Sequence, residues 1–325
     1  MNGSLTDGPL PKKILSPHLI VIWLFLLSLP LWLLAIGGYY SIVTQVLILG
    51  LAAMALNYLL GFTGVLSFGH AAYFGLGAYG CGLTIKFIAA STPLGILVGV
   101  MVGTIAGALI GALIVRLRGV YFAMVTIAFS QVFYFIAFRW NSVTGGDDGL
   151  GGFERRPIDL FGFTIDIQHN QMLFYYFVLL LVALGVGAMG LLLRSPLGRA
   201  QLAIRENERR ARFLGLNIER HIWIAWVISC GFTSLAGALY ALLDNFADPR
   251  LLYWTFSGDL VIMTVLGGMR SFWGPMLGAA LFVILRDTIS SHTENWMSFI
   301  GLFFVLVVLF FPRGVLGMLQ RRKGG

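Results

Sequence analysis

The side chains best placed for chemistry in this chain surround His70. Ser67 and Tyr73 lie about one helical turn away on either side, so three groups able to exchange hydrogen bonds occur in one short stretch. Such a set could line a polar path, although a lone histidine in apolar sequence is more often a buried packing residue with satisfied hydrogen bonds. No pair of histidines or cysteines has the spacing of metal ligands, so we predict no metal site.

The sequence lacks the motifs of an enzyme. None of the 5 histidines is close in sequence to both a plausible nucleophile and a carboxylate. No lysine is followed by serine or threonine, which excludes a Walker-type loop for ATP hydrolysis. We therefore predict a non-catalytic chain without a cofactor, while an intramembrane enzyme stays open as an alternative. If the chain moves a solute uphill, we expect the free energy of ATP hydrolysis not to enter through this chain itself.

The composition predicts an integral membrane protein. Hydrophobic residues make up 58% of the chain, charged residues 11%, and the mean hydropathy is +0.87. Apolar runs of about 20 residues, the length needed to cross the hydrocarbon core, recur along the chain. We predict an all-α, polytopic membrane protein and disfavour a soluble, wholly buried helical bundle. Cys81 and Cys230 fall in apolar segments and suggest no disulfide framework.

The distribution of charge predicts the topology. A net charge of +8 would suit nucleic-acid binding, but the basic residues collect at segment ends, as the positive-inside rule requires. We therefore predict no nucleic-acid partner and place both termini in the cytoplasm. The predicted spans lie near residues 19–36, 40–60, 66–88, 93–115, 119–138, 171–193, 221–243, 255–269, 272–289 and 296–312. The predicted domains are an inner tail at 1–18, a transmembrane domain at 19–312 with an outer loop at 139–170 and an inner loop at 194–220, and an inner tail at 313–325.

Two glycine-rich segments, at residues 61–80 and 266–280, are predicted to interrupt the helices. Irregular backbone at membrane depth is tolerated only where protein or a water-filled cavity satisfies its polar groups. In many transporters such segments mark the substrate path. The candidate path residues are Ser67, Gly69, His70, Tyr73, Gly267 and Gly268.

Acidic residues are scarce within the predicted spans. An ion-coupled carrier often keeps aspartate or glutamate inside its spans, where such a group is costly and is retained for function. Only Asp259 and Asp287 come close to such a position. This distribution disfavours an ion-coupled secondary carrier, which we keep as the alternative function.

Glycine recurs every four residues in the fourth predicted span. The repeat consists of Gly95, Gly99, Gly103, Gly107 and Gly111. Small residues at this spacing expose the backbone along one face and let a neighbouring helix approach closely. We predict a helix-packing face.

A segment rich in charged residues of both signs interrupts the hydrophobic sequence at residues 198–220. Ser195 and Pro196 are typical of a helix start and Gly215 of a helix end, so we predict one helix between them. Its small and apolar side consists of Ala200, Ala203, Ile204, Ala211 and Leu214. The charged remainder could face anionic lipid or a soluble protein, and the acids among the arginines favour a protein.

This segment, GRAQLAIRENERRARFLGLNIER, resembles the cytoplasmic loop of permease subunits from branched-chain amino acid ABC importers, in particular the M-type subunit. The similarity continues in three further stretches, NYLLGFTGVLSFGHAAYFGLGAY, VTGGDDGLGG and LGGMRSFWGPMLGAA, and so covers most of the chain. The resemblance implies the ABC-importer permease fold in the bacterial inner membrane, surrounded by lipid. It implies transport of branched-chain amino acids or a related small solute such as urea, another amino acid or a small organic acid.

The resemblance also implies partners and the residues that meet them. The expected partners are a homologous second permease, two cytoplasmic ATPase subunits and a periplasmic solute-binding protein. The residues expected to contact the ATPases are Arg205, Glu206, Asn207 and Glu208. The loop at 139–170 becomes periplasmic, and its residues expected to face the binding protein are Gly145, Gly146, Asp147 and Asp148.

Overall fold

The computed structural model describes residues 23, 26–30, 39–160, 163–269, 271–293, 295–310 and 314. The N-terminal tail, most of the first predicted span and nearly all of the C-terminal tail lie outside these residues. The described chain is helical apart from one short antiparallel hairpin, formed by β1 (Ile158–Leu160) and β2 (Phe163–Ile165). The prediction of a helical membrane domain is confirmed, with this hairpin in the outer loop as the exception.

Among the described residues, five helices are long and apolar enough to cross a membrane. They are α2 (Tyr40–Leu60), α4 (Thr92–Ile114), α5 (Val120–Arg139), α7 (Gln171–Arg194) and α10 (Ile218–Asp244). The shorter elements are α3 (His70–Leu83), η2 (Thr84–Ile88), α6 (Asn141–Thr144), η3 (Gly146–Asp148), α8 (Pro196–Glu206), α9 (Glu208–Phe213), η4 (Pro249–Leu252), α11 (Trp254–Gly267), α12 (Gly274–Ser290) and α13 (Trp296–Phe310). Since α3, α11 and α13 have 14 or 15 residues, the predicted count of ten spans stays a prediction.

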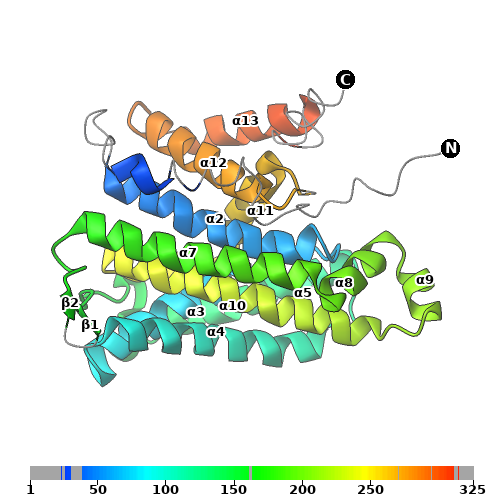
Figure 1. The fold of residues 1–325 in the computed structure, drawn as a ribbon, viewed down its shortest axis with the longest axis horizontal. Helices are drawn as coiled ribbons and strands as arrows, with labels where there is room; N and C mark the ends of the chain where they lie inside the picture. Colours follow the sequence, from blue (N-terminus) through cyan, green and yellow to red (C-terminus); the bar gives the residue numbers. More distant parts are fainter. Residues whose placement is uncertain are drawn as a thin grey trace.

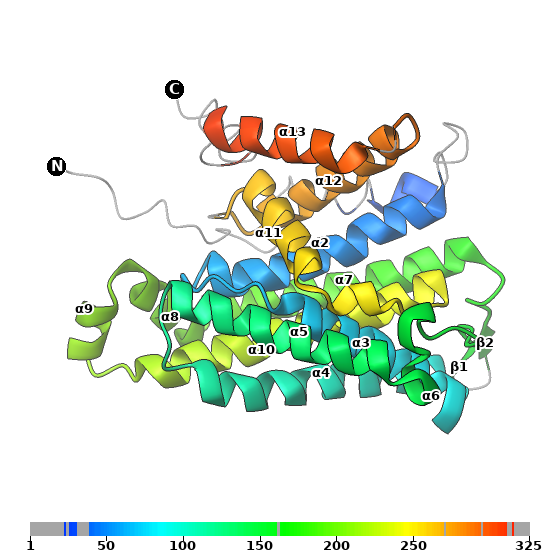
Figure 2. The same cartoon turned by 180° about the vertical axis from the view of Figure 1, so that it is seen from behind.

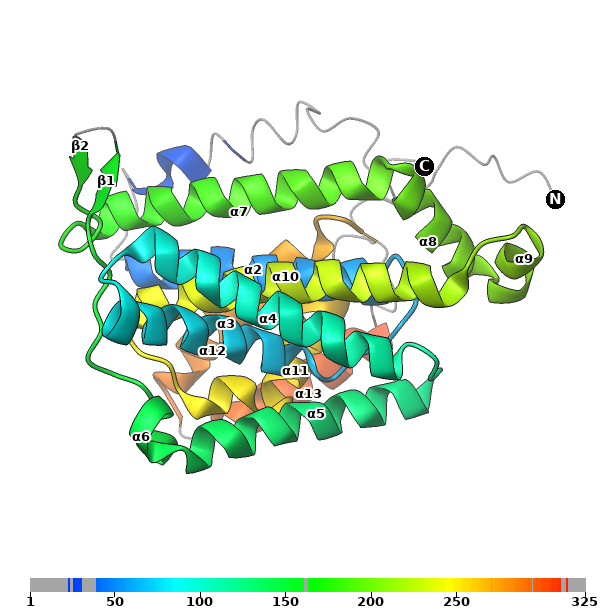
Figure 3. The ribbon, with the colours of Figure 1, turned by 90° about the horizontal axis from the view of Figure 1, so that it is seen from below.

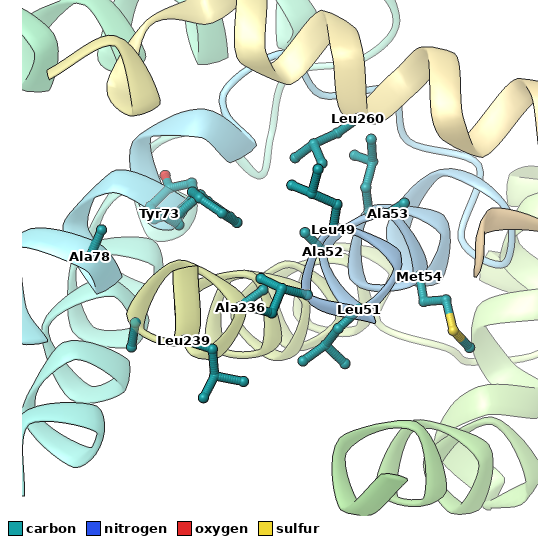
Figure 4. Packing of buried hydrophobic residues seen from close by; sticks show 14 of the residues in the cluster. Leu49, Leu51, Ala52, Ala53, Met54, Tyr73, Ala78, Ala236, Leu239 and Leu260 are labelled. Carbon is teal, nitrogen blue, oxygen red and sulfur yellow. The ribbon is translucent and has the colours of Figure 1, made fainter. Parts of the chain in front are cut away.

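Helix α2 runs through the centre of the molecule. It contacts α7 and α10 on one side and α11 and α12 on the other (Figure 1). Seen from behind, α5 lies on the outside of the bundle next to α3 (Figure 2). Small and branched side chains such as Leu49, Ala52 and Ala53 allow this crowding (Figure 4). The continuous core around α2 joins the two halves of the chain.

The glycine repeat of α4 packs against α3 and α10. A Cβ atom on Gly99 would lie 2.5 Å from the carbonyl oxygen of Gly77 in α3, and one on Gly107 would lie 2.7 Å from the Cβ of Cys230 in α10. The opposite face of α4 exposes Leu97, Met101, Ile105, Leu109 and Leu113, as expected of a face that meets lipid. These contacts confirm the predicted packing role of the glycines.

The segment at 198–220 differs from the single predicted helix. It forms α8 and α9, which are separated at Asn207, where the backbone is extended and the side-chain oxygen accepts a hydrogen bond from the N–H of Arg210. Asparagine ends one helix here because its side chain satisfies the free N–H groups that begin the next. Leu214, predicted to be on the buried side, is 74% exposed, because it follows the end of α9.

The third predicted span also begins later than expected. Residues 61–69 are irregular, and the helix starts at His70. The positive φ of Gly64, 84°, belongs to this irregular segment. The inner loop with α8 and α9 and the outer loop with β1 and β2 lie at opposite ends of the long helices (Figure 3).

Candidate translocation and coupling site

His70 begins α3 and is buried, with 0% of its surface exposed. Its Nδ1 atom lies 3.0 Å from the Ser67 hydroxyl, and its Nε2 atom lies 2.7 Å from the Ser229 hydroxyl of α10. Ser229 donates its own proton to the carbonyl oxygen of Ala55 in α2, at 2.5 Å. Ser229 must therefore accept the bond from His70, which assigns the proton to Nε2 and makes Nδ1 the acceptor from Ser67.

Aromatic rings enclose the same imidazole. Trp226 lies edge-on at 5.5 Å and Tyr73 at 6.3 Å between ring centroids. The indole N–H of Trp226 donates to the carbonyl oxygen of Gly107, at 2.8 Å. His70 thus joins α2, α3, α4 and α10 by hydrogen bonds and close packing, as a satisfied core histidine does.

Replacing His70 with alanine is expected to destabilise the protein by about 2–4 kcal/mol, because a cavity forms and two buried hydroxyls lose a partner. Thermal unfolding of the purified protein in detergent measures this loss. The control is His221→Ala, since the His221 ring is partly exposed and donates from Nδ1 to the Asn217 carbonyl oxygen in its own helix turn. Equal melting temperatures for the wild type and His70→Ala would show that the hydrogen-bonded network contributes nothing.

The candidate path residues separate into two buried groups. Ser67, Gly69, His70 and Tyr73 lie together at the start of α3, where Gly69 donates its N–H to the Ser67 hydroxyl at 3.1 Å. Gly267 and Gly268 form a second group at the turn between α11 and α12. All six are buried inside the chain, so their assignment to a path stays a prediction.

Backbone atoms meet closely at the second group. A Cβ on Gly274 would lie 2.6 Å from the carbonyl oxygen of Gly268, so no larger side chain fits without moving the backbone. The φ of Gly268 is 112°, a value that side chains disfavour. Asn57 of α2 also donates its Nδ2–H to the Ser271 carbonyl oxygen at 3.0 Å. The end of α2 and this turn are therefore held in a fixed relation.

Sequence reasoning missed the connection between α10 and α11, which packs against the bundle. The segment containing η4 packs into the bundle, because the Ser130 hydroxyl of α5 donates to the Leu252 carbonyl oxygen at 2.7 Å. The N–H of Ala71 then donates to the Ser257 hydroxyl of α11, also at 2.7 Å. The sequence signal for this connection was weak, since only Asp248 and Pro249 mark the turn.

The irregular residues 63–68 form one wall of a cavity of about 660 Å³ at the inner end of the bundle. The α4–α5 turn at residues 117–120 and residues 204–208, which include the four expected ATPase contacts, form its other walls. The Arg205 guanidinium donates to the carbonyl oxygen of Gly61, two residues before the first wall segment. This bond ties α8 to the irregular segment that leads to His70.

Glu208 belongs to a network of four charges. It accepts from Arg118 of the α4–α5 turn at 3.2 Å and from Arg212 of α9 at 3.3 Å. Glu219, at the start of α10, lies 3.6 Å from Arg118 and 3.1 Å from Arg212. The network fixes α9 against two spanning helices, while Glu206 is exposed. Of the four expected ATPase contacts, Glu206 and Asn207 are the exposed ones.

Arg118 and Glu208 are expected to stabilise each other by about 0.2–1 kcal/mol, because both side chains are more than one-third exposed and water screens the pair. A double-mutant cycle with Arg118→Ala and Glu208→Ala, read by thermal unfolding, measures this coupling. Exactly additive effects of the two substitutions would contradict a direct interaction. The Arg209→Ala and Glu208→Ala pair serves as the uncoupled control, since Arg209 is exposed.

The expected binding-protein contacts form one outer turn. Gly145 and Gly146 both have positive φ angles, 81° and 64°, and lead into η3, where Asp147 and Asp148 are exposed. These acids line a second cavity of about 500 Å³ together with Arg139. The structure thus brings three of the four expected residues to one outer hollow, while Gly146 is buried beneath it.

Arg155 anchors the rest of the outer loop. Its guanidinium stacks over the Phe174 ring at 4.3 Å and donates to the carbonyl oxygen of Leu242 at 3.4 Å. Burial lowers the pKa of Arg155, because desolvation disfavours its charge. The loop is also tied to the end of α10 by two backbone bonds between Leu150 and Ala247. The outer turn is therefore held on a rigid support.

Comparison with known proteins gives the family. The model of the branched-chain amino acid transport system permease component matches residues 38–309. The high-affinity branched-chain amino acid transport system permease protein LivM of Escherichia coli (strain K12) is 29% identical over 318 residues, which cover 92% of this chain and 73% of the relative. LivH of the same organism is 31% identical over 135 residues, covering 40% of this chain and 42% of the relative.

A more distant relative is the probable branched-chain amino acid transport permease protein LivM of Methanocaldococcus jannaschii. It is 24% identical over 218 residues, which cover 62% of this chain and 61% of the relative. No solved structure matches the chain. The family model covers the helices from α2 almost to the end of α13 together with the inner and outer loops. The chain therefore belongs to the family of branched-chain amino acid transport system permease components.

Proposed function

We propose that this chain is the M-type permease subunit of an ATP-driven importer, and forms half of a path for branched-chain amino acids or a related small solute. The observation that carries this proposal is the family match over residues 38–309. The bacterial inner membrane is the expected location, with both termini in the cytoplasm and ten spans in total. The lysine and arginine bias of the loops supports this orientation.

Two cytoplasmic ATPases supply the free energy, since this chain has no Walker-type loop of its own. They contact the inner loop at 194–220 through the exposed Glu206 and its neighbours. The bond between Arg205 and Gly61 supports the coupling role, because it links α8 with the irregular segment at residues 61–69. Displacement of α8 by an ATPase then moves one wall of the cavity of about 660 Å³. We interpret this cavity as the inner end of the path.

The second permease and the solute-binding protein complete the assembly. The partial match of this chain to LivH supports a homologous second permease. The outer turn with Asp147 and Asp148 receives the binding protein, and its exposure and rigid support favour that role. The candidates for the path itself are the residues from Ser67 to Tyr73 and the pair Gly267–Gly268. They fit this role because buried protein groups satisfy the hydrogen bonds of the irregular backbone there.

Affinity purification of the chain from its native host in mild detergent tests the proposal. The expected result is co-purification of two ATPase subunits and a second permease, identified by mass. A chain that is always isolated alone, from cells shown to express these partners, would favour the stand-alone secondary carrier. Asp259, Asp287 and His70 would then become the candidates for ion coupling.

A further inference from the structure

A buried glutamine of α8 has no hydrogen-bond partner. The Gln201 side chain is 0% exposed, and among the described residues neither its amide nitrogen nor its amide oxygen meets a partner. The hydroxyl of Tyr58 in α2, a residue that is 1% exposed, is likewise without a partner in the described chain. Buried polar groups are nearly always hydrogen-bonded, because an unpaired one bears the full cost of losing its water. Three unpaired polar atoms in this part of the molecule are therefore unusual.

Gln201 and Tyr58 lie on the faces by which α8 and α2 meet. The Arg205 guanidinium, one helical turn after Gln201, donates to the carbonyl oxygen of Gly61. Gly61 in turn is three residues after Tyr58. Residues three or four apart share one helix face, so Gln201 is on the side of α8 that faces the end of α2. The Gln201 amide is close enough to the Tyr58 hydroxyl to act on it, although the two do not form a hydrogen bond of ordinary length and angle.

Arg205 joins the two elements in the present arrangement. Gly61 is at the C-terminal end of α2, where the helix dipole favours a positive charge. The aliphatic stem of Arg205 also lies along the irregular segment, since a Cβ on Gly64 would be 3.0 Å from the Arg205 Cγ atom. Helix α8 is thus held at Arg205, while the neutral pair one turn earlier makes no bond. A shift of α8 that loosens the Arg205 contact can bring Gln201 and Tyr58 into line.

We propose that Gln201 and Tyr58 form a hydrogen bond when ATP-loaded ATPase subunits displace α8, and that this bond stabilises the displaced arrangement. Both residues are then positioning residues, which touch neither the solute nor the nucleotide and set the balance between two arrangements of the inner loop. The inference rests on the proposed function and adds to it the pair of residues that favours one state of the transport cycle.

The first measurement is the melting temperature of the full-length chain in detergent, without nucleotide. Tyr58→Phe removes an unpaired hydroxyl, so the melting temperature should be unchanged or higher. Tyr175→Phe is the matched control, because Tyr175 of α7 is also 0% exposed but its hydroxyl donates to the Leu26 carbonyl oxygen at 2.8 Å. This control should melt at a lower temperature than the wild type. An equal decrease in Tyr58→Phe would show that its hydroxyl is already bonded and would overturn the inference.

The second measurement is the apparent affinity of the assembled importer for ATP, in lipid nanodiscs and with ATPase subunits that bind ATP without hydrolysing it. Because ATP binding is coupled to the displaced arrangement, Tyr58→Phe and Gln201→Met should each weaken this affinity about fivefold, as expected for one neutral hydrogen bond. The double variant should be no weaker than either single variant, and Tyr175→Phe should equal the wild type. Effects that multiply in the double variant would show that the two residues do not bond to each other.

Solute uptake separates this inference from the proposed function. In both single variants the maximal uptake rate should fall, whereas the solute concentration for half-maximal uptake should not change, since neither residue touches the solute. Absence of ATP-dependent uptake in the wild type would contradict the proposed function. Full uptake with unchanged ATP affinity in both variants would rule out the Gln201–Tyr58 bond alone.

Discussion

Replacing Gly103 with leucine is expected to remove most of the folded protein from the membrane. A Cβ atom at this position would overlap the Ser234 hydroxyl and lie 3.2 Å from the carbonyl oxygen of Tyr73. Ser234 belongs to the rigid face of α10, where its hydroxyl donates to the Cys230 carbonyl oxygen at 2.7 Å. Overpacking of this kind costs roughly 1–3 kcal/mol or more, and a leucine adds three carbons beyond the Cβ.

The loss would be measured as membrane expression and as the melting temperature of any protein recovered. Gly187→Leu is the matched control, since Gly187 is also inside a spanning helix, α7, but nothing lies within 4 Å of its Cβ position. Gly103→Ala should be intermediate. Normal expression and melting temperature of Gly103→Leu would refute close approach of α4 to α3 and α10.

Reversing the charges of Glu206 and Glu208 together is expected to reduce ATP-driven uptake at least tenfold while the chain stays inserted. Glu206 is exposed and free to meet a partner, whereas Glu208 holds α9 through Arg118 and Arg212. Reversal replaces attraction with like-charge repulsion, which costs a protein interface several kcal/mol. Exposed ion pairs stabilise the chain itself by only about 0.2–1 kcal/mol, so folding survives.

The measurement is solute uptake together with co-purification of the ATPases. Glu206→Arg alone should lose the ATPases without altering thermal stability, whereas Glu208→Arg alone should also lower the melting temperature. Glu206→Gln is the control that removes the charge but keeps the size, and its effect should be smaller. Full uptake by a stably expressed double variant would exclude these acids from coupling.

The two predictions concern different surfaces of one packed group of helices, which consists of α3, α4 and α10. The glycine repeat lets α4 approach α3 and α10, and His70 then bonds to Ser229 of α10 within the same packed region. The inner loop at 194–220 is attached to the same helices through Arg205 and through the Arg118–Glu208 pair. We expect a movement imposed at α8 to reach the start of α3 through these short, partly buried connections.

The sequence was sufficient for the class of protein, the ends of five spanning helices and the family. These properties follow from local patterns, because the free energy of burying apolar residues in a bilayer adds up along each segment. The N-cap at Ser195 with Pro196 was also predictable, since capping involves only neighbouring residues. The break at Asn207 was missed because the apolar spacing continues across it and therefore looks like that of one helix. In the structure, this single polar residue ends α8 and begins α9.

Only the tertiary structure decided what the polar residues contact. His70 and Ser229 are 159 residues apart in sequence, and Arg118 and Glu208 are 90 apart, so no local pattern could pair them. Hydrogen bonds and ion pairs act over a few ångströms, and the crossing of helices sets which distant residues reach that range. The sequence by itself therefore determined a helical membrane permease, whereas the packing of its helices determined which polar groups are structural and which are free to bind.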